Sequence, residues 1–175
     1  MSVSLPENGD AAEKSKVSYG KTQKTREPKF EAPPDSIPPQ NLEAEEAVLG
    51  GILLDPDAIS RVVDLLQPEA FYLSAHREIY RTALMLHSQG KPTDLTAMTA
   101  WLADTNSLQK IGGNTRLIEL VERVASTASI EEVAKLIMDK FLRRQLIRSG
   151  NEVIQLGFDQ SKPMDEVLDK AEQTI

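Results

Sequence analysis

An unbroken helical pattern of apolar residues near the C-terminus constrains the fold most. No proline interrupts the chain between Ser129 and Pro163. Ser129 and Glu132 have the spacing of a capping box, the signature of a helix N-terminus. Apolar residues that recur every three to four positions lie on one face of a helix, so we predict a continuous helix of about 28 residues, roughly 40 Å long. Its apolar positions are Ile130, Val133, Ile137, Phe141, Ile147, Val153 and Ile154.

A turn and a second helical segment follow the long helix. A long helix, a short turn and another helix make an antiparallel helical hairpin. We expect this hairpin in residues 129–175, with its second helix truncated by the end of the chain. The turn is indicated by Gly157, Lys162 and Pro163, and the second helix by Val167, Leu168, Ala171 and Ile175.

Shorter helical segments fill residues 37–128 and predict a compact head of about five helices. The chain shows no strand-like alternation of useful length, so the expected fold class is all-α. The residues that favour helix starts are Asn41 for the first helix, Asp55-Pro56 for the second, Ser74 for the third, Thr93 or Asp94 for the fourth, and Asn114, after a Gly112-Gly113 turn, for the fifth.

Two adjacent glycines stand in the apolar middle of the first predicted helix. Gly50 and Gly51 each cost a helix interior about 1 kcal/mol relative to alanine. A residue without a side chain lets a facing helix approach closely, which regains that cost in packing. We therefore expect both glycines to face a neighbouring helix of the head. The alternative is that the first helix ends at Gly50 as a C-cap.

Residues 1–36 differ from the rest in composition. They hold few large apolar side chains, so we predict a disordered tail that cannot bury enough surface to fold. Within it, Gly20-Lys21-Thr22 resembles the end of a phosphate-binding loop. The first glycine of that motif is replaced by Ser15, and neither a strand nor a helix flanks it. The motif works only between a strand and a helix, so we expect no phosphate loop here.

Charge and cysteine usage exclude several classes of function. Six basic and six acidic residues cancel within residues 1–40, so the net charge of −7 belongs to residues 41–175. DNA binding rests mainly on phosphate neutralisation by Lys and Arg, so an acidic head and hairpin favour protein partners over nucleic acid. The chain contains no cysteine and no apolar run of membrane-spanning length. We expect a cytoplasmic protein without a membrane partner.

No catalytic constellation or metal site is evident. His76 and His87 are eleven residues apart on one predicted helix, about 16 Å along its axis, too far to share a metal ion. We interpret them as surface or half-buried histidines. Glu45 and Glu46 complement the positive end of a helix dipole. One basic stripe on the long helix is either a solvated face or a docking or phosphate-contacting strip, and it comprises Lys140, Arg143, Arg144 and Arg148.

Several segments in combination resemble one known family. The runs PPQNLEAEEAVLGGILLD, FYLSAHREIY, GKPTDLTAMTAWLADTNSLQKIGG and FLRRQLIRSGNEVIQLGF, in that order and spacing, are similar to the N-terminal domain of the bacterial replicative DNA helicases of the DnaB family. The resemblance covers residues 37–175.

The resemblance implies a non-catalytic collar module. Members of the family are hexameric, ATP-driven helicases, whose N-terminal heads and hairpins pair as a trimer of dimers and dock the C-terminal domain of primase; a loader also acts on the ring in several lineages. ATP and Mg²⁺ bind in a RecA-like C-terminal domain, which we expect to be absent from this chain. We therefore expect no cofactor, no metal and no direct nucleic-acid site here.

The resemblance also implies a docking surface shared by head and hairpin. Position by position, we assign the primase contacts to Glu43, Arg116, Ile147 and Val153. Because Ile147 and Val153 are six residues apart, one core stripe cannot hold both, and at least one should be exposed as an anchor. The alternative is that both belong to the hairpin core.

A second class of function remains open at this point. The chain could be a free-standing helical adaptor that binds a replication protein, because the primase domain that docks on such collars resembles them in fold. A RecA-like domain downstream of Ile175 would favour the collar module over the adaptor.

Overall fold

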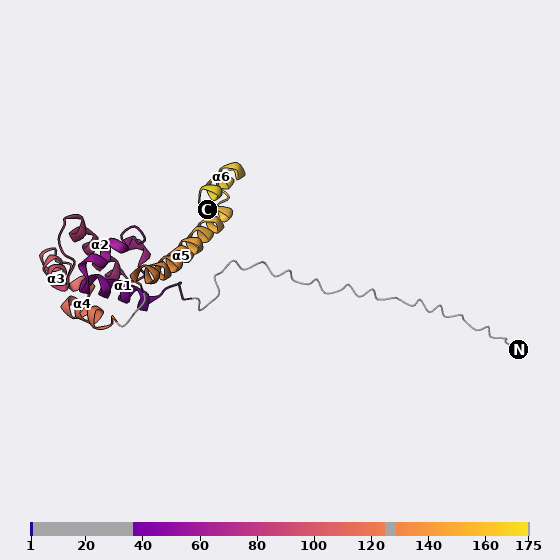
Figure 1. The fold of residues 1–175 in the computed structure, drawn as a ribbon. Coiled ribbons are helices and arrows are strands. Elements are labelled where there is room, and N and C mark those ends of the chain that lie inside the picture. The colour runs from indigo at the N-terminus through magenta and orange to yellow at the C-terminus, as the bar shows by residue number, and fades with distance from the viewer. Residues whose placement is uncertain (2–36, 125–128, 175) are drawn as a thin grey trace. The chain divides into compact units, whose positions relative to one another are not determined.

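The computed structural model describes residue 1, residues 37–124 and residues 129–174, and these residues form helices and no strand, which confirms the all-α prediction (Figure 1). The predicted disordered tail and its Gly20-Lys21-Thr22 sequence fall on residues outside the described ranges. The α-helices are α1 (Leu42–Leu54), α2 (Ser74–Ser88), α3 (Leu95–Asp104), α4 (Gly113–Glu122), α5 (Ile130–Phe158) and α6 (Met164–Thr174), and the 3-10 helices are η1 (Pro56–Arg61), η2 (Pro68–Ala70) and η3 (Gln109–Ile111).

Two of the predicted α-helix caps are confirmed by hydrogen bonds. The Asn41 side chain accepts a hydrogen bond from the Ala44 amide at 3.1 Å, at the start of α1. The Asp94 carboxylate accepts from the amides of Thr96 and Ala97 at 2.9 Å, at the start of α3. These side chains satisfy amides that have no partner within the helix, which fixes where each helix begins.

Helices α2 and α5 begin where predicted, at Ser74 and directly after Ser129, and α4 begins one residue before Asn114, but none of these three side chains caps its helix. Ser74 is the first residue of α2 and makes no capping hydrogen bond, because Leu73 holds the extended cap position. α4 begins at Gly113, one residue before Asn114, and its cap position is held by Gly112. Gly112 has a φ of +98°, a left-handed conformation that favours glycine. The Asn114 side chain instead bonds the Thr99 hydroxyl at 3.1 Å. Ser129 does precede α5, but its hydroxyl bonds the Glu131 carboxylate and caps no amide.

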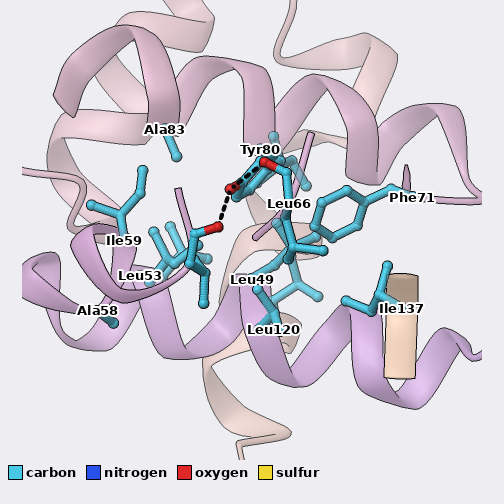
Figure 2. Packing of buried hydrophobic residues seen from close by; sticks show 14 of the residues in the cluster. Leu49, Leu53, Ala58, Ile59, Leu66, Phe71, Tyr80, Ala83, Leu120 and Ile137 are labelled. Carbon is cyan, nitrogen blue, oxygen red and sulfur yellow. Dashed lines mark hydrogen bonds between the residues drawn. The ribbon is translucent and has the colours of Figure 1, made fainter. Parts of the chain in front are cut away.

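The second predicted helix is also shorter than expected. Asp55 caps it and Pro56 occupies its first turn as predicted, but the segment is the 3-10 helix η1 followed by turns. The Tyr80 hydroxyl donates toward the carbonyls of Val62 and Leu66, at 3.4 and 3.3 Å. Figure 2 shows Tyr80 and Leu66 side by side, with the hydrogen bond dashed. Burial raises the pKa of Tyr80, so its hydroxyl keeps the proton that it donates.

The central element of the head is α1. Side chains around most of its circumference are buried, and α1 contacts α2, α3, α4, α5 and η1. A helix that is buried on nearly all sides belongs in the core. The rings of Phe71 and Tyr80 pack with centroids 4.9 Å apart beside this helix (Figure 2). The largest fully buried side chains of the core include Leu49, Ile52, Ile59, Ile79, Leu86, Met98, Leu102, Leu117, Leu120 and Ile137.

The glycine pair lies inside α1, so the alternative that the helix ends at Gly50 is wrong. A Cβ atom added to Gly50 would lie 2.3 Å from the Leu120 carbonyl oxygen and 2.4 Å from a methyl carbon of Val124, both on the α4 side. A Cβ added to Gly51 would lie 3.3 Å from the tip of Ile130 and, among the described residues outside its own helix, would meet no backbone atom within 4 Å. Gly50 is therefore the residue that permits α4 to cross α1 at close range.

The long helix α5 joins the head to the hairpin. It is continuous over 29 residues, and Val133, Ala134, Ile137 and Phe141 in its first half belong to the core of the head. Among the described elements α6 packs only on α5, with Val167 buried between them (Figure 1). None of the described helices is long and apolar enough to cross a membrane.

The glycine geometry predicts unequal effects of two adjacent substitutions. We expect Gly50→Ala to destabilise the head by about 1–3 kcal/mol, because the new methyl group meets a backbone oxygen that cannot move alone. Gly51→Ala is the matched control, since the Ile130 tip can shift and alanine gains up to about 1 kcal/mol of helix propensity. Urea denaturation measures both. Equal stability of the two variants would contradict the close approach at Gly50.

Candidate functional site

A buried acid and a buried histidine lie at the centre of a polar cluster in the head. The side chains of Glu45 on α1 and His76 on α2 are 1% and 0% exposed, and Glu45 Oε2 is 2.7 Å from His76 Nδ1. The other carboxylate oxygen of Glu45 accepts a hydrogen bond from the Tyr72 amide at 2.6 Å. A buried charge is tolerated only when it is hydrogen-bonded in this way.

Arg116 of α4 also belongs to the cluster, and its contact identifies which ring nitrogen of His76 accepts a hydrogen bond. Its Nη2 is 2.9 Å from His76 Nε2 and 2.7 Å from Glu46 Oε1. A guanidinium only donates hydrogen bonds, so Nε2 of His76 must be the acceptor. In this arrangement Nδ1–H of His76 is the donor to Glu45. The imidazole links α1, α2 and α4 through hydrogen bonds at both nitrogens.

Glu46 joins the same cluster from the next position of α1. Its carboxylate accepts hydrogen bonds from Arg116 and from Arg123, the latter at 3.0 and 3.2 Å. Partial burial acts to raise the pKa of Glu46, but the hydrogen bonds and charges of both arginines outweigh it, and the pKa lies below its ordinary value. Glu46 of α1 thus pairs with both Arg116 and Arg123, which are seven residues apart, and these pairs hold α4 against α1.

These polar groups hold the helices together and leave no reactive group available. Glu45 and His76 have no access to solvent, and each nitrogen of His76 is engaged. Within residues 37–124 and 129–174, no three or more acidic or histidine side chains converge as a metal site would require. The geometry of this cluster supports docking of α4 on α1 and α2.

The four residues of the basic stripe on α5 do not all face solvent. Lys140 and Arg143 pair with Asp139, and Arg143 is 62% exposed, as the interpretation as a solvated face predicts. Arg148 is exposed as well. For Arg144 that interpretation is wrong, because its guanidinium turns inward and donates to the carbonyls of Pro39 and Ala70. Since Asp139 offsets part of the exposed positive charge, the stripe lacks the concentrated basic surface of a DNA-binding face.

The four residues assigned to primase docking lie in both parts of the molecule. Glu43 is exposed in the first turn of α1, and the Arg116 side chain is 19% exposed while it bonds Glu46, His76 and Glu119. On α5, Ile147 is 49% exposed and Val153 is half-buried. The alternative that both belong to the hairpin core is wrong for Ile147. The sets lie on separate elements, Glu43 and Arg116 on the head and Ile147 and Val153 on α5.

Sequence reasoning missed the buried cluster. The interpretation of His76 as a surface or half-buried residue is wrong, because the ring is fully buried, whereas His87 is half-buried. Glu45 was explained by the helix dipole alone, yet it lies on the core face of α1. A signal existed: Glu45 follows Leu42 by three residues and precedes Leu49 by four, and His76 precedes Ile79 by three, so both polar residues occupy apolar-face positions.

Comparison with known proteins identifies close relatives of this arrangement. Residues 37–139 match the family model described as DnaB-like helicase N terminal domain. The chain is 57% identical over 139 residues to the replicative DNA helicase DnaB of Nostoc sp. (strain PCC 7120), a match that covers 79% of this chain and 16% of that protein. The chain thus spans about one sixth of the length of that curated relative.

Two solved structures share the fold. The crystal structure of the N-terminal domain of DnaB helicase from Mycobacterium tuberculosis matches with a TM-score of 0.75 and 37% identity, over 79% of this chain and 98% of that chain. A DnaB-like replicative helicase, solved to describe its interactions with primase, matches with a TM-score of 0.64 and 30% identity, over 77% of this chain and 32% of that chain.

The lowered pKa of Glu46 predicts a pH-dependent contribution to stability. The depressed pKa means that the ion pairs stabilise the head above the ordinary glutamate pKa of 4.5 and lose that effect as pH falls through the lowered value. We expect Glu46→Gln to cost about 1–2 kcal/mol at neutral pH and progressively less in acid. Urea denaturation of the parent and of Glu46→Gln, from neutral pH to below pH 4.5, measures the difference in their free energies of unfolding.

A surface pair provides the control for this measurement. Glu132 pairs with Lys135 in a position where both side chains are more than half exposed. Glu132→Gln should change stability little at any pH, because exposed pairs contribute little. A Glu46→Gln effect that is independent of pH would contradict the role of its charge.

Proposed function

The chain belongs to the family of DnaB-like helicase N-terminal domains, and from this premise we propose that it is the collar module of a hexameric, ATP-dependent replicative DNA helicase. In this role it assembles with copies of itself and docks the C-terminal domain of primase during bacterial DNA replication. The observation that carries the proposal is the match to almost the whole solved N-terminal domain from Mycobacterium tuberculosis, head and hairpin together.

The proposal assigns no chemical step to this chain. The buried side chains of Glu45 and His76 and the partly buried side chain of Arg116 form hydrogen bonds that join helices to one another. ATP hydrolysis, with its Mg²⁺, belongs to the RecA-like motor domain of the full-length helicase, and the place of action is the cytoplasm. The domain contributes assembly and recruitment, for which a rigid surface suffices.

Exposed apolar side chains support self-assembly through the hairpin. Leu142 and Leu146 on α5 are 59% and 70% exposed, and Met164 and Leu168 on α6 are 67% and 55% exposed. Monomeric soluble proteins seldom expose large apolar side chains in such numbers on one element pair, and such surfaces mark contacts with other chains. A second hairpin would cover them.

The same reasoning supports docking of primase on head and hairpin. Ile147 offers an exposed aliphatic anchor, with Val153 less than two turns away along α5. On the head, Glu43 contributes an exposed charge, and Arg116 contributes a guanidinium already oriented by Glu46. The proposed partner therefore contacts an apolar surface and a charged one together.

Light scattering tests self-assembly. We expect the mass of this chain to rise with concentration toward a dimer or a higher species, because burial of the exposed apolar side chains favours association. Leu146→Glu should shift the equilibrium toward the monomer by placing a charge in the interface. A parent chain that stays monomeric at high concentration would count against the collar proposal.

Titration with the C-terminal domain of the cognate primase tests docking. We expect Ile147→Ala to weaken binding by about 1–2 kcal/mol, and Val153→Ala by less, because loss of a buried aliphatic anchor removes that amount of apolar contact. Calorimetry measures the affinities, and circular dichroism checks that each variant is folded.

Leu136 is the matched control for this titration. It is a half-exposed aliphatic residue on α5, like Ile147, but it lies three turns nearer the N-terminus of the helix. Leu136→Ala should bind primase as the parent does. If the Ile147 and Val153 variants are folded and also bind as the parent does, the docking surface lies elsewhere on the domain.

A further inference from the structure

One charged side chain of α5, that of Arg144, bonds the head where the long helix leaves its core. In α5, Val133, Ile137 and Phe141 follow one another at intervals of four residues and pack in the core of the head. Arg144 lies three residues further along the same stripe, where the helix leaves the core. Within the described residues, no position of α5 after Arg144 belongs to the core cluster or bonds a side chain or carbonyl of the head.

Arg144 binds two separate segments of the head at once. Its Nη1 donates to the Pro39 carbonyl at 2.7 Å, and its Nη2 donates to the Ala70 carbonyl at 2.5 Å. Its guanidinium carbon lies 5.7 Å from the Tyr72 ring centre and 5.8 Å from that of Phe141. The planar fork of arginine, unlike the compact ammonium of lysine, can bond two carbonyls in fixed directions and contact aromatic rings at the same time.

The segment of the head that accepts a hydrogen bond from Arg144 at Ala70 is itself held by other hydrogen bonds. Arg77 of α2 donates to the carbonyls of Phe71 and Tyr72, at 2.7 and 3.1 Å. The Tyr72 amide donates to the buried carboxylate of Glu45. The segment between η2 and α2 is therefore held by charged side chains from α1 and α2, and it presents the Ala70 carbonyl to α5 as a rigid acceptor.

Burial of this arginine has a cost that surface exposure would avoid. Burial lowers the pKa of the Arg144 guanidinium, an effect that the charge of Glu45 opposes and that of Arg77 reinforces. A side chain of this length at the edge of a core usually extends to water. Arg144 instead exchanges part of its hydration for hydrogen bonds to two backbone carbonyls of the head.

We propose that Arg144 is the positioning residue that fixes the angle at which the hairpin leaves the head. A partner that contacts head and hairpin together needs both surfaces in one relative orientation. Arg144 thus acts on docking without touching the partner, and this consequence, unlike the angle itself, rests on the proposed function. If the head and hairpin hold the orientation that binds the partner for only a fraction of the time, the apparent affinity for the partner is the intrinsic affinity multiplied by that fraction.

Distance measurements between spin labels test the angle directly. The chain has no cysteine, so a spin label reacts only where a cysteine is introduced. The first pair of labels is placed at two exposed positions, Ala103→Cys in α3 and Asn151→Cys in α5. A second pair, Ala103→Cys with Ser60→Cys, reports on the head alone. Labelled chains are diluted with unlabelled chain so that only distances within one molecule are read.

The expected result is a change confined to the pair that spans the junction. The parent should give a narrow distribution for both pairs. Arg144→Met should broaden the distribution between Ala103→Cys and Asn151→Cys and leave the pair within the head narrow. Arg144→Lys should broaden it less, because one ammonium cannot replace the fork. Arg143→Met is the matched control, since among the described residues Arg143 bonds Asp139 of its own helix and no group of the head, and it should change neither pair.

Two outcomes would overturn the proposal. One is an unchanged junction distance in Arg144→Met. The other is broadening of the pair within the head in both Arg144 variants, which would make Arg144 a support of the head itself.

Titration of the same variants with the primase C-terminal domain separates this inference from the proposed function. Arg144→Met should bind several-fold more weakly than Arg143→Met. A parent that does not bind primase would contradict the proposed function, while the distances would still decide the role of Arg144.

Discussion

The close crossing of α4 over α1 is the constraint on which the rest of the head depends. At Gly50 the backbone of α4 occupies the space of a missing side chain, with the Leu120 carbonyl 2.3 Å from where a Cβ would lie. That approach places Arg116 within reach of both Glu46 and His76. The glycine cost of about 1 kcal/mol is offset because the crossing allows α1 to be buried on nearly all sides.

Charged groups then connect this crossing to the hairpin. From Arg116, hydrogen bonds lead through His76 to Glu45, and from Glu45 to the Tyr72 amide. The segment that contains Tyr72 also receives Arg144 of α5. In a low-dielectric interior such a fully paired network specifies one arrangement of helices, because any alternative leaves a buried charge unpaired. The head is thereby suited to hold two surfaces in register for a partner.

The sequence predicted the elements better than it predicted their connections. Periodicity located all six α-helices, α1 to α6, and local patterns located the caps Asn41 and Asp94, because these features depend on local chemistry. It did not predict that the second segment is 3-10, since Tyr80 reaches its carbonyls from a distant helix. Nor did it find the inward turn of Arg144, which depends on carbonyls 105 and 74 residues away. A local pattern carries no information on such partners.

The central claim is that head and hairpin form one docking unit, and hydrogen exchange of the chain with and without the primase C-terminal domain tests it most directly. The account predicts slower amide exchange on complex formation in two places: the start of α1 with the facing part of α4, and α5 beyond Arg144. Slowing that is absent from both places, or that is confined to a different face such as α3, would contradict it.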